Sequence, residues 1–325
     1  MHLPVLLTES VDLLRPALSG GGVWVDVTLG LGGHAAAILA ACPEARLVAI
    51  DRDPAALAEA RQRLAAWSGR IDFVLAAFSE MERRLGELGL GKVQGIFADL
   101  GVSSLQLDDA GRGFSFRHDA PLDMRMGRPA TTSEAADEGE GTDEILTARV
   151  VVNEYPEAEL ARIFMEYGEE QQARRIARGI GKAREQKPIE TTGELARLIE
   201  GLKPESFRPR EGKKRLHPAT QVFQALRIEV NHELEELEQL LDQATRLLDA
   251  SGRLVVISYH SLEDRIVKHT LRDLASGEIE PITGRPRAET QVLEVLTRKP
   301  IRPSEQEVAA NPRSRSARLR AARRL

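Results

Sequence analysis

Short apolar runs alternate with helical patterns over roughly the first hundred residues of the chain. Four runs rich in Val, Ile and Leu have the length and composition of buried strands, at residues 23–27, 46–50, 71–75 and 93–98. Helical patterns separate them, at residues 35–41, 54–66 and 79–88. Pro54 stands at a position that suits the first turn of a helix. Alternation of strand and helix predicts a parallel sheet with right-handed crossovers.

The alternation stops after the fourth strand. A loop-like stretch rich in Gly, Arg and Asp covers residues 108–127, and an acidic segment at 134–144 is expected to be flexible. Helical patterns follow at 158–185 and 192–202 with no strand between them, and further ones occur at 218–231 and 233–250. Strand patterns return at 253–259, 291–296 and 317–322. We therefore expect one discontinuous α/β domain, residues 1–114 and 213–325, with a mainly helical insertion at 115–212.

Composition narrows the class of protein without identifying it. The 325 residues suffice for one large domain or two ordinary ones. No apolar run approaches the roughly 20 residues of a membrane span, and the N-terminus lacks a signal-peptide pattern, so a cytoplasmic protein is expected. A single cysteine, Cys42, excludes an intrachain disulfide and a multi-cysteine zinc cluster, and no metal is expected.

The charges are segregated along the chain, although the formal net charge is −5. Lys203–Arg215 holds six bases against two acids, and the stretch from Arg298 to the end holds nine against two. The segment 134–144 holds six acids and no base. Phosphate binding depends on where positive charge lies rather than on the total. An anionic partner is therefore expected at the two basic regions.

A glycine-rich turn joins the first predicted strand to the first predicted helix, in the sequence DVTLGLGGH at residues 26–34. Glycines allow the backbone to approach a ligand closely, and a helix N-terminus offers N–H groups to an anion. Asp51 follows the second strand, 18 residues after Gly33, where nucleotide-binding sheets place the acid that binds ribose hydroxyls. Two other interpretations stay open: an ordinary tight turn with Asp51 as a helix cap, and a dinucleotide site.

Further candidates follow the other strands. Asp99 ends the fourth strand, and ligands of open α/β sheets bind outside the carboxyl ends of the strands. We expect Asp26, Asp51 and Asp99 to converge on one crevice for that reason. Phe78, after the third strand, is a candidate to lie against an adenine ring, with burial in the core as the alternative.

Longer motifs carry a resemblance to a known family. The segments DVTLGLGGH, AIDRDP, GFSFRHDAPLDMRM, HPATQVFQALRIEVN, SYHSLEDRIVK and NPRSRSARLR occur in the order seen in the MraW/RsmH family, and the similarity spans Pro4 to Arg320. The resemblance implies a class I S-adenosylmethionine-dependent methyltransferase fold, Rossmann-like and mostly parallel, with an inserted helical domain for RNA recognition. It also implies S-adenosyl-L-methionine as donor and the N4 amine of a cytidine in 16S rRNA of the small ribosomal subunit as acceptor.

The resemblance also assigns residues. The cofactor contacts of the family correspond to Gly32, Gly33, His34, Asp51, Phe78, Asp99 and Gln106. Two features depart from the family pattern. The acidic stretch around Glu138–Arg149 is longer than the family usually carries, and Gln221 stands where an Arg is expected.

The proposed reaction suggests catalytic candidates. Cytosine N4 is a poor nucleophile, and a group that accepts a hydrogen bond from it would favour transfer; Asp99 or a carbonyl of residues 100–104 is the candidate. His260 is either catalytic or the cap of the helix that starts near Glu263, and the sequence leaves both open. Tyr259 is a candidate to stack on the base, because aromatic rings often hold unpaired RNA bases.

Cys42 and the loop Gly113–Phe116 bear on the acceptor. Methylation of cytosine carbon C5 generally needs a thiolate that adds to the ring, whereas an exocyclic amine attacks the donor directly. Cys42 lies at the far end of the first helix from the glycine turn and is expected to be a packing residue. The helical insertion and Gly113–Phe116 are expected to hold an unpaired cytidine.

Two other functions stay open. One is an enzyme of the same fold that methylates an amine of DNA or protein, and the other is a non-catalytic ribosome-binding factor. A homodimer is also left open by the sequence.

Overall fold

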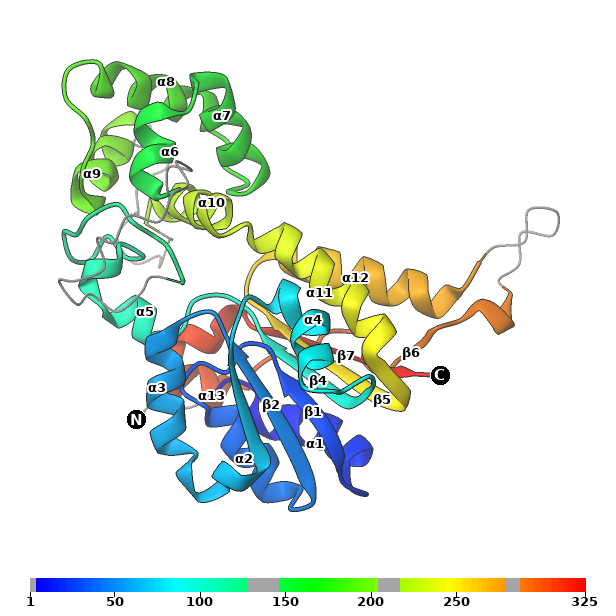
Figure 1. The fold of residues 1–325 in the computed structure, drawn as a ribbon. Coiled ribbons are helices and arrows are strands. Elements are labelled where there is room, and N and C mark those ends of the chain that lie inside the picture. Colours follow the sequence, from blue (N-terminus) through cyan, green and yellow to red (C-terminus); the bar gives the residue numbers. More distant parts are fainter. Residues whose placement is uncertain (1–3, 128–145, 204–216, 279–286) are drawn as a thin grey trace. The chain divides into compact units, whose positions relative to one another are not determined.

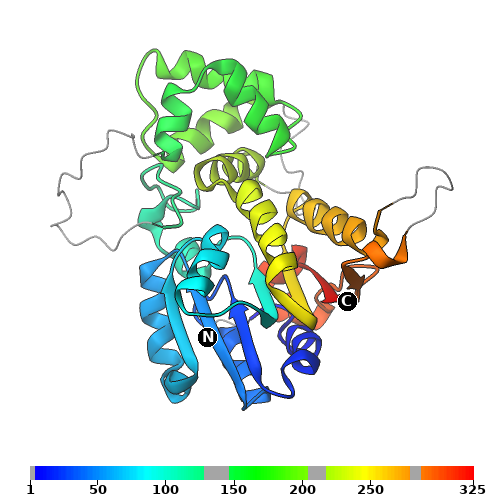
Figure 2. The same cartoon turned by 45° about the vertical axis from the view of Figure 1, so that its right-hand side comes forward.

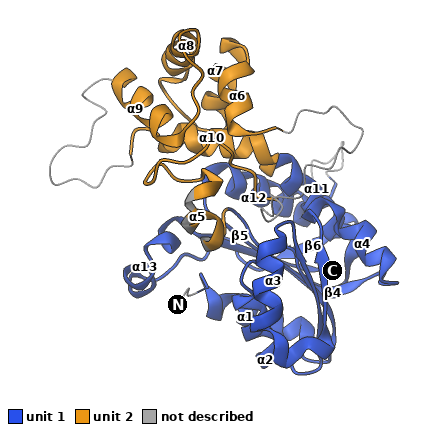
Figure 3. Ribbon diagram, turned by 60° about the vertical axis from the view of Figure 1, so that its left-hand side comes forward, with its two compact units in different colours: residues 1–101, 234–325 blue, residues 102–233 orange. Residues whose placement is uncertain are grey.

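The chain forms two compact units in the computed structural model (Figure 3). Unit 1 consists of residues 1–101 and 234–325, and unit 2 consists of residues 102–233. The structure describes residues 4–127, 146–203, 217–278 and 287–325. The acidic stretch 134–144 and most of the basic stretch 203–215 lie outside the described residues.

Unit 1 contains a seven-stranded sheet with the strand order β3-β2-β1-β4-β5-β7-β6 (Figure 1). Neighbouring strands from β3 to β5 are parallel, and β7 runs antiparallel to both β5 and β6. The predicted α/β class with a mostly parallel sheet is confirmed. The strands are β1 (Gly22–Asp26), β2 (Ala45–Asp51), β3 (Ile71–Leu75), β4 (Val93–Asp99), β5 (Leu248–Ser258), β6 (Leu293–Val295) and β7 (Arg318–Arg324).

Helices cover both faces of this sheet because side chains of a strand alternate between its faces. Trp24 and Phe97 belong to one buried cluster, whereas their neighbours Val25 and Ile96 belong to another. The first cluster includes residues of α1 (Leu7–Leu18), α2 (Gly33–Ala41) and α3 (Pro54–Arg63). The second includes residues of α4 (Met81–Glu87), α11 (Glu233–Leu247) and α12 (Ser261–Ser276), and Figure 2 shows the same elements from another side. A short helix, α13 (Glu305–Ala310), precedes β7.

Unit 2 is helical and has its own hydrophobic core. Its helices are α5 (Ser104–Asp108), α6 (Ala148–Glu154), α7 (Glu157–Glu166), α8 (Ala173–Arg184), α9 (Thr192–Leu202) and α10 (Thr220–Asn231). Val222, Phe223 and Leu226 of α10 belong to this core. The two compact units divide the chain at 101/102 and 233/234, and α10 packs with the inserted helices. The expected domain boundaries at 114/115 and 212/213 stay a prediction.

The helical pattern at 158–185 does not form one helix. It is broken between α7 and α8, where Glu169 adopts a left-handed backbone conformation with φ 50° and the N–H of Glu170 donates to the carbonyl of Phe164. The predicted helix 54–66 is also too long, since α3 ends at Arg63. Among the described helices, none is both long and apolar enough to cross a membrane.

Candidate active site

Three aspartates stand at or near the carboxyl ends of neighbouring strands. Asp26 ends β1, Asp51 ends β2 and Asp99 ends β4, and β1 lies between the other two. The strand order reverses between β1 and β4, which is where open α/β sheets bind ligands. The structure therefore brings together the three acids that the sequence predicted to converge.

Both carboxylate oxygens of Asp51 accept hydrogen bonds from backbone N–H groups. Its Oδ2 accepts the N–H of Gly30 at 2.8 Å, and its Oδ1 accepts the N–H of Asp53 at 2.8 Å. A carboxylate oxygen has two lone-pair sites, so each oxygen can accept a further hydrogen bond. Burial raises the pKa of Asp51 to about 6, and the group is mostly ionised at neutral pH. These contacts leave a charged acceptor beside the glycine turn.

Asp26 differs from Asp51 in its charge. Its side chain is fully buried, and burial raises the pKa of Asp26 to about 8, so the carboxyl group is mainly protonated at neutral pH. The N–H of Thr28 donates to its Oδ1 at 3.1 Å. The hydroxyl oxygen of Thr28 accepts the N–H of Asp99 at 2.6 Å and so links the ends of β1 and β4. This role of Thr28 was not predicted from the sequence.

The glycine turn requires glycine for two separate reasons. Gly32 has φ 70°, in the left-handed region that disfavours side chains. At Gly33 an added Cβ would lie 2.5 Å from Cγ of Pro4, closer than two carbon atoms can approach. Gly32 is also the N-cap of α2, with no side-chain cap bond. The turn therefore leaves the start of α2 uncovered by its own side chains.

The N-terminal segment Pro4–Leu6 lies against this turn, and nothing in the sequence pattern indicated it. Nε2 of His34 is 2.8 Å from the carbonyl oxygen of Val5, so Nε2–H donates this bond. Burial lowers the pKa of His34 to about 4, and the ring is neutral at physiological pH. Its Nδ1 lies 3.7 Å from Oδ2 of Asp99. His34 thus ties the N-terminal segment to the turn and faces Asp99 as a neutral ring.

Asp99 also contacts the residue that follows β5. The hydroxyl of Tyr259 donates to Oδ1 of Asp99 at 2.8 Å. Burial and the adjacent carboxylate of Asp99 raise the pKa of Tyr259 well above its usual value, so the hydroxyl keeps its proton. The tyrosine hydroxyl therefore fixes one oxygen of the carboxylate that we expect at the reaction centre.

His260 lies in the cap of α12. Its Nδ1 accepts the N–H of Glu263, and Glu263 Oε2 accepts the N–H groups of Tyr259 at 2.8 Å and His260 at 3.3 Å. The reciprocal bonds form a capping box. Nε2 of His260 lies 3.2 Å from Oε1 of Glu263. Of the two roles that the sequence left open, this geometry supports the cap.

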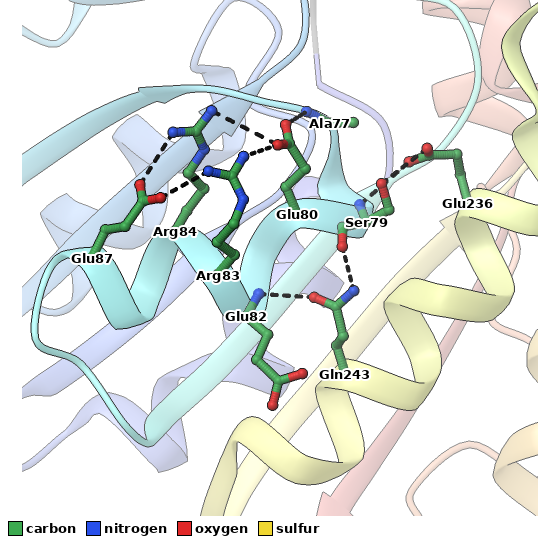
Figure 4. A network of polar contacts seen from close by, with 9 residues as sticks. All are labelled: Ala77, Ser79, Glu80, Glu82, Arg83, Arg84, Glu87, Glu236 and Gln243. Carbon is green, nitrogen blue, oxygen red and sulfur yellow. Dashed lines mark hydrogen bonds and ion pairs between the residues drawn. The ribbon is translucent and has the colours of Figure 1, made fainter.

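Phe78 begins the short turn Phe78–Glu80 after β3, and Figure 4 shows that side chains of α11 bind the next residue, Ser79. The hydroxyl of Ser79 donates to Glu236 at 2.9 Å, and Gln243 binds both the carbonyl of Ser79 and the N–H of Glu82. Phe78 itself is half-buried against the second sheet cluster. Its expected contact with adenine stays a prediction.

The remaining predicted residues belong to unit 2. Gln106 is buried, accepts the N–H of Ser103 at 3.0 Å and donates to the carbonyl of Met126 at 3.2 Å. In the loop Gly113–Phe116, the ring of Phe116 stacks on His217 with centroids 4.2 Å apart. Gln221 donates to the carbonyl of Glu169 at 3.1 Å. Their expected contacts with cofactor or RNA stay predictions.

Comparison with known proteins gives a match along the whole chain. Residues 1–325 match the MraW methylase family. Ribosomal RNA small subunit methyltransferase H of Thermobifida fusca (strain YX) is 51% identical over 325 residues, which cover 99% of this chain and 93% of the relative. The protein of the same name from Geobacter sp. (strain M21) is 50% identical over 327 residues, with 98% and 97% covered. Among solved structures, an rRNA methylase from Streptococcus thermophilus is 11% identical with a TM-score of 0.44, over 100% of this chain and 99% of the other.

Proposed function

The chain belongs to the MraW methylase family, and from this membership we propose that it transfers the methyl group of S-adenosyl-L-methionine to small-subunit ribosomal RNA. The observation that carries the proposal is identity of about half of all positions, over nearly the full length of both chains, to small-subunit rRNA methyltransferases. The compartment expected for such a substrate is the cytoplasm.

The residues at the strand ends fit the cofactor. Asp51 offers acceptor capacity to the two ribose hydroxyls, and the uncapped start of α2 at Gly32 suits the carboxylate of the methionine moiety. The bound sulfonium supplies an electrophilic methyl group. Gly33, His34, Phe78 and Gln106 remain further proposed contacts.

The proposed acceptor is the N4 amine of a cytidine in 16S rRNA. Asp99 is the group we assign to accept a hydrogen bond from that amine, since Tyr259 binds its carboxylate and Thr28 binds its backbone N–H. His260 supports this arrangement through the cap of α12 rather than by contact with substrate. The cytidine is expected to be unpaired, because a base inside a duplex cannot reach a donor at a sheet edge.

Cys42 argues for amine transfer over methylation of C5. It is buried at the C-terminal end of α2, away from the glycine turn, and burial raises the pKa of its thiol. A nucleophilic thiol needs an accessible thiolate. Cys42→Ser should therefore retain near-normal turnover, and no covalent adduct should form with RNA that carries 5-fluorocytidine.

The test is methyl incorporation from labelled S-adenosyl-L-methionine into small ribosomal subunits, with DNA and protein as control acceptors. The proposal expects N4-methylcytidine in 16S rRNA on nucleoside mass spectrometry. If label appeared only in DNA or protein, the result would support an enzyme of the same fold that methylates an amine of DNA or protein. If no acceptor were labelled, the result would support a non-catalytic ribosome-binding factor.

A further inference from the structure

The helix α8 carries exposed positive charges that form no ion pair with any described residue. Five bases and no acid occur between Gln171 and Arg184. Four of them are exposed on α8: Arg174, Arg175, Arg178 and Lys182. The opposite face, which includes Ile176, Ala177 and Ile180, is buried in the core of unit 2. Because the opposite face is packed in the core, the orientation of α8 is fixed and the cations stay on its exposed side.

Several exposed arginines on other helices pair with nearby acids. Arg83 contacts Glu80 and Glu87, as Figure 4 shows. Arg162 of the neighbouring helix α7 contacts Glu159 and Glu166. Arg246 contacts Glu82 and Asp242. Pairing with a nearby acid is thus common among the exposed helical arginines that the structure describes, although Arg61 and Arg63 of α3 form no such ion pair.

The four cations of α8 form no such pair with any described residue. Glu157 lies against this helix at Gly181, Glu170 accepts the N–H of the N-cap residue Gln172, and Glu185 is the C-cap residue. Arg174, Arg178 and Lys182 follow one another at four-residue intervals, so they lie in a row with about 6 Å of rise between them. Like charges at this spacing destabilise an isolated helix, and an anionic partner would relieve the repulsion.

The basic regions singled out in the sequence are partly used inside the protein. Lys203 is buried, and its Nζ lies 2.5 Å from Oε2 of Glu170. Arg318 and Arg320 of the C-terminal region both bind Asp264. These three side chains are already neutralised. Arg298, Lys299, Arg302 and Arg315 of the C-terminal region are exposed and form no ion pair with a described residue, as is true of the four cations of α8. The cations of α8 differ from them in lying together on one face of a single helix.

We propose that the exposed face of α8, formed by Arg174, Arg175, Arg178 and Lys182, is a docking surface for the phosphate backbone of the RNA substrate. A row of cations on one helix face binds backbone charge without reading sequence, and so positions RNA rather than selecting the base. This inference rests on the proposed function, because it assumes that small-subunit rRNA is the substrate.

The test is the triple variant Arg174→Gln, Arg178→Gln, Lys182→Gln, which keeps good helix formers at all three positions. We expect RNA affinity to fall at least roughly tenfold, and the slope of log affinity against log salt to flatten by about 0.7–0.9 for each phosphate that the variant no longer binds. Affinity for S-adenosyl-L-methionine and the circular dichroism spectrum should stay unchanged. The matched control is Arg83→Gln, Arg162→Gln, Arg246→Gln, which removes equal charge from paired arginines.

Each outcome decides the inference. Equal decreases in the variant and the control would attribute the effect to net charge and overturn it. Unchanged RNA affinity together with abolished binding to whole subunits would assign α8 to a ribosomal protein and also overturn it. The wild type provides the separate check: if it transfers no methyl group to small-subunit rRNA, the proposed function fails, whereas an active wild type with an unaffected variant contradicts only the role of α8.

Discussion

At the scale of single residues, the site places three chemically identical side chains in different environments. Asp26 is fully buried and mainly protonated, whereas Asp51 accepts two backbone N–H bonds and is mostly ionised at neutral pH. Asp99 accepts a hydrogen bond from the hydroxyl of Tyr259. The environment of each carboxyl group thus suits it to a different task.

Asp51→Ala should weaken binding of S-adenosyl-L-methionine. Loss of a hydrogen bond to a charged group costs about 1.5–3 kcal/mol, which corresponds to roughly 10- to 150-fold in the dissociation constant. Because the pKa of Asp51 is raised to about 6, wild-type affinity should also fall as the pH drops through 6 and the carboxylate gains a proton. Titration calorimetry across about pH 5–8 measures both effects; an Asp51→Ala protein that is folded and binds normally contradicts the assignment.

Tyr259→Phe should lower kcat and leave the KM for S-adenosyl-L-methionine nearly unchanged. The substitution removes only the hydroxyl that holds Oδ1 of Asp99. A bond of this kind supplies at most about 1.5–3 kcal/mol, so the rate should fall by up to roughly 10- to 150-fold. Single-turnover kinetics with enzyme in excess over RNA gives the transfer rate directly. A changed KM with an unchanged rate would instead place the hydroxyl in cofactor binding.

At the scale of elements, hydrogen bonds link the N-terminal cap of α12 to Asp99 at the expected reaction centre. The capping box of His260 and Glu263 also binds the N–H of Tyr259, and Tyr259 reaches Asp99. The segment Tyr259–Glu263 is therefore one hydrogen-bonded unit in which the start of α12 fixes a side chain at the end of the neighbouring strand β4.

Two substitutions of His260 separate a cap from a catalyst. His260→Ala should lower the free energy of unfolding by about 1 kcal/mol, the usual loss for a removed N-cap. His260→Asn restores a good cap and should return both stability and turnover close to the wild-type values. Denaturant unfolding and methyl transfer are measured on the same preparations. Full stability with abolished turnover in His260→Asn would make His260 a catalytic residue.

Local patterns predicted the elements of the first half of the sheet well. Ile71–Leu75 was predicted with its observed ends, and the other three early strands differ by single residues. The break at Glu169 escaped prediction because helical periodicity continues on both sides of it. The contact of Pro4 with Gly33 and the pair of Lys203 with Glu170 join residues distant in sequence, and no local pattern encodes such contacts.

At the scale of the whole molecule, unit 1 is assembled from two separate parts of the chain. Residues 1–101 supply β1 to β4, and residues 234–325 supply β5, β7 and β6. The last strand in sequence, β7, lies inside the sheet, with β5 on one side and β6 on the other. Its Leu319, Ala321 and Ala322 are fully buried.

Deletion of residues 318–325 should therefore prevent stable folding of unit 1. It removes the ladder partners of β5 and β6 and the buried Leu319, whose side chain alone contributes about 1.5–3 kcal/mol. Total stabilities of domains are only about 5–15 kcal/mol. Thermal unfolding followed by circular dichroism measures the loss. Leu325→Ser, at an exposed position, serves as the control and should unfold like the wild type.

The separation of β4 from β5 in the sequence also has a consequence for folding during translation. Roughly 150 residues separate the end of β4 from the start of β5, and a ribosome adds about 5–20 residues per second. In the nascent chain β4 therefore lacks its neighbour β5 for about 7–30 s. During that interval the apolar strand Val93–Asp99 is an open edge, the kind of surface that recruits other chains into aggregates. Newly made protein is expected to depend on a chaperone that shields this edge until translation passes β5.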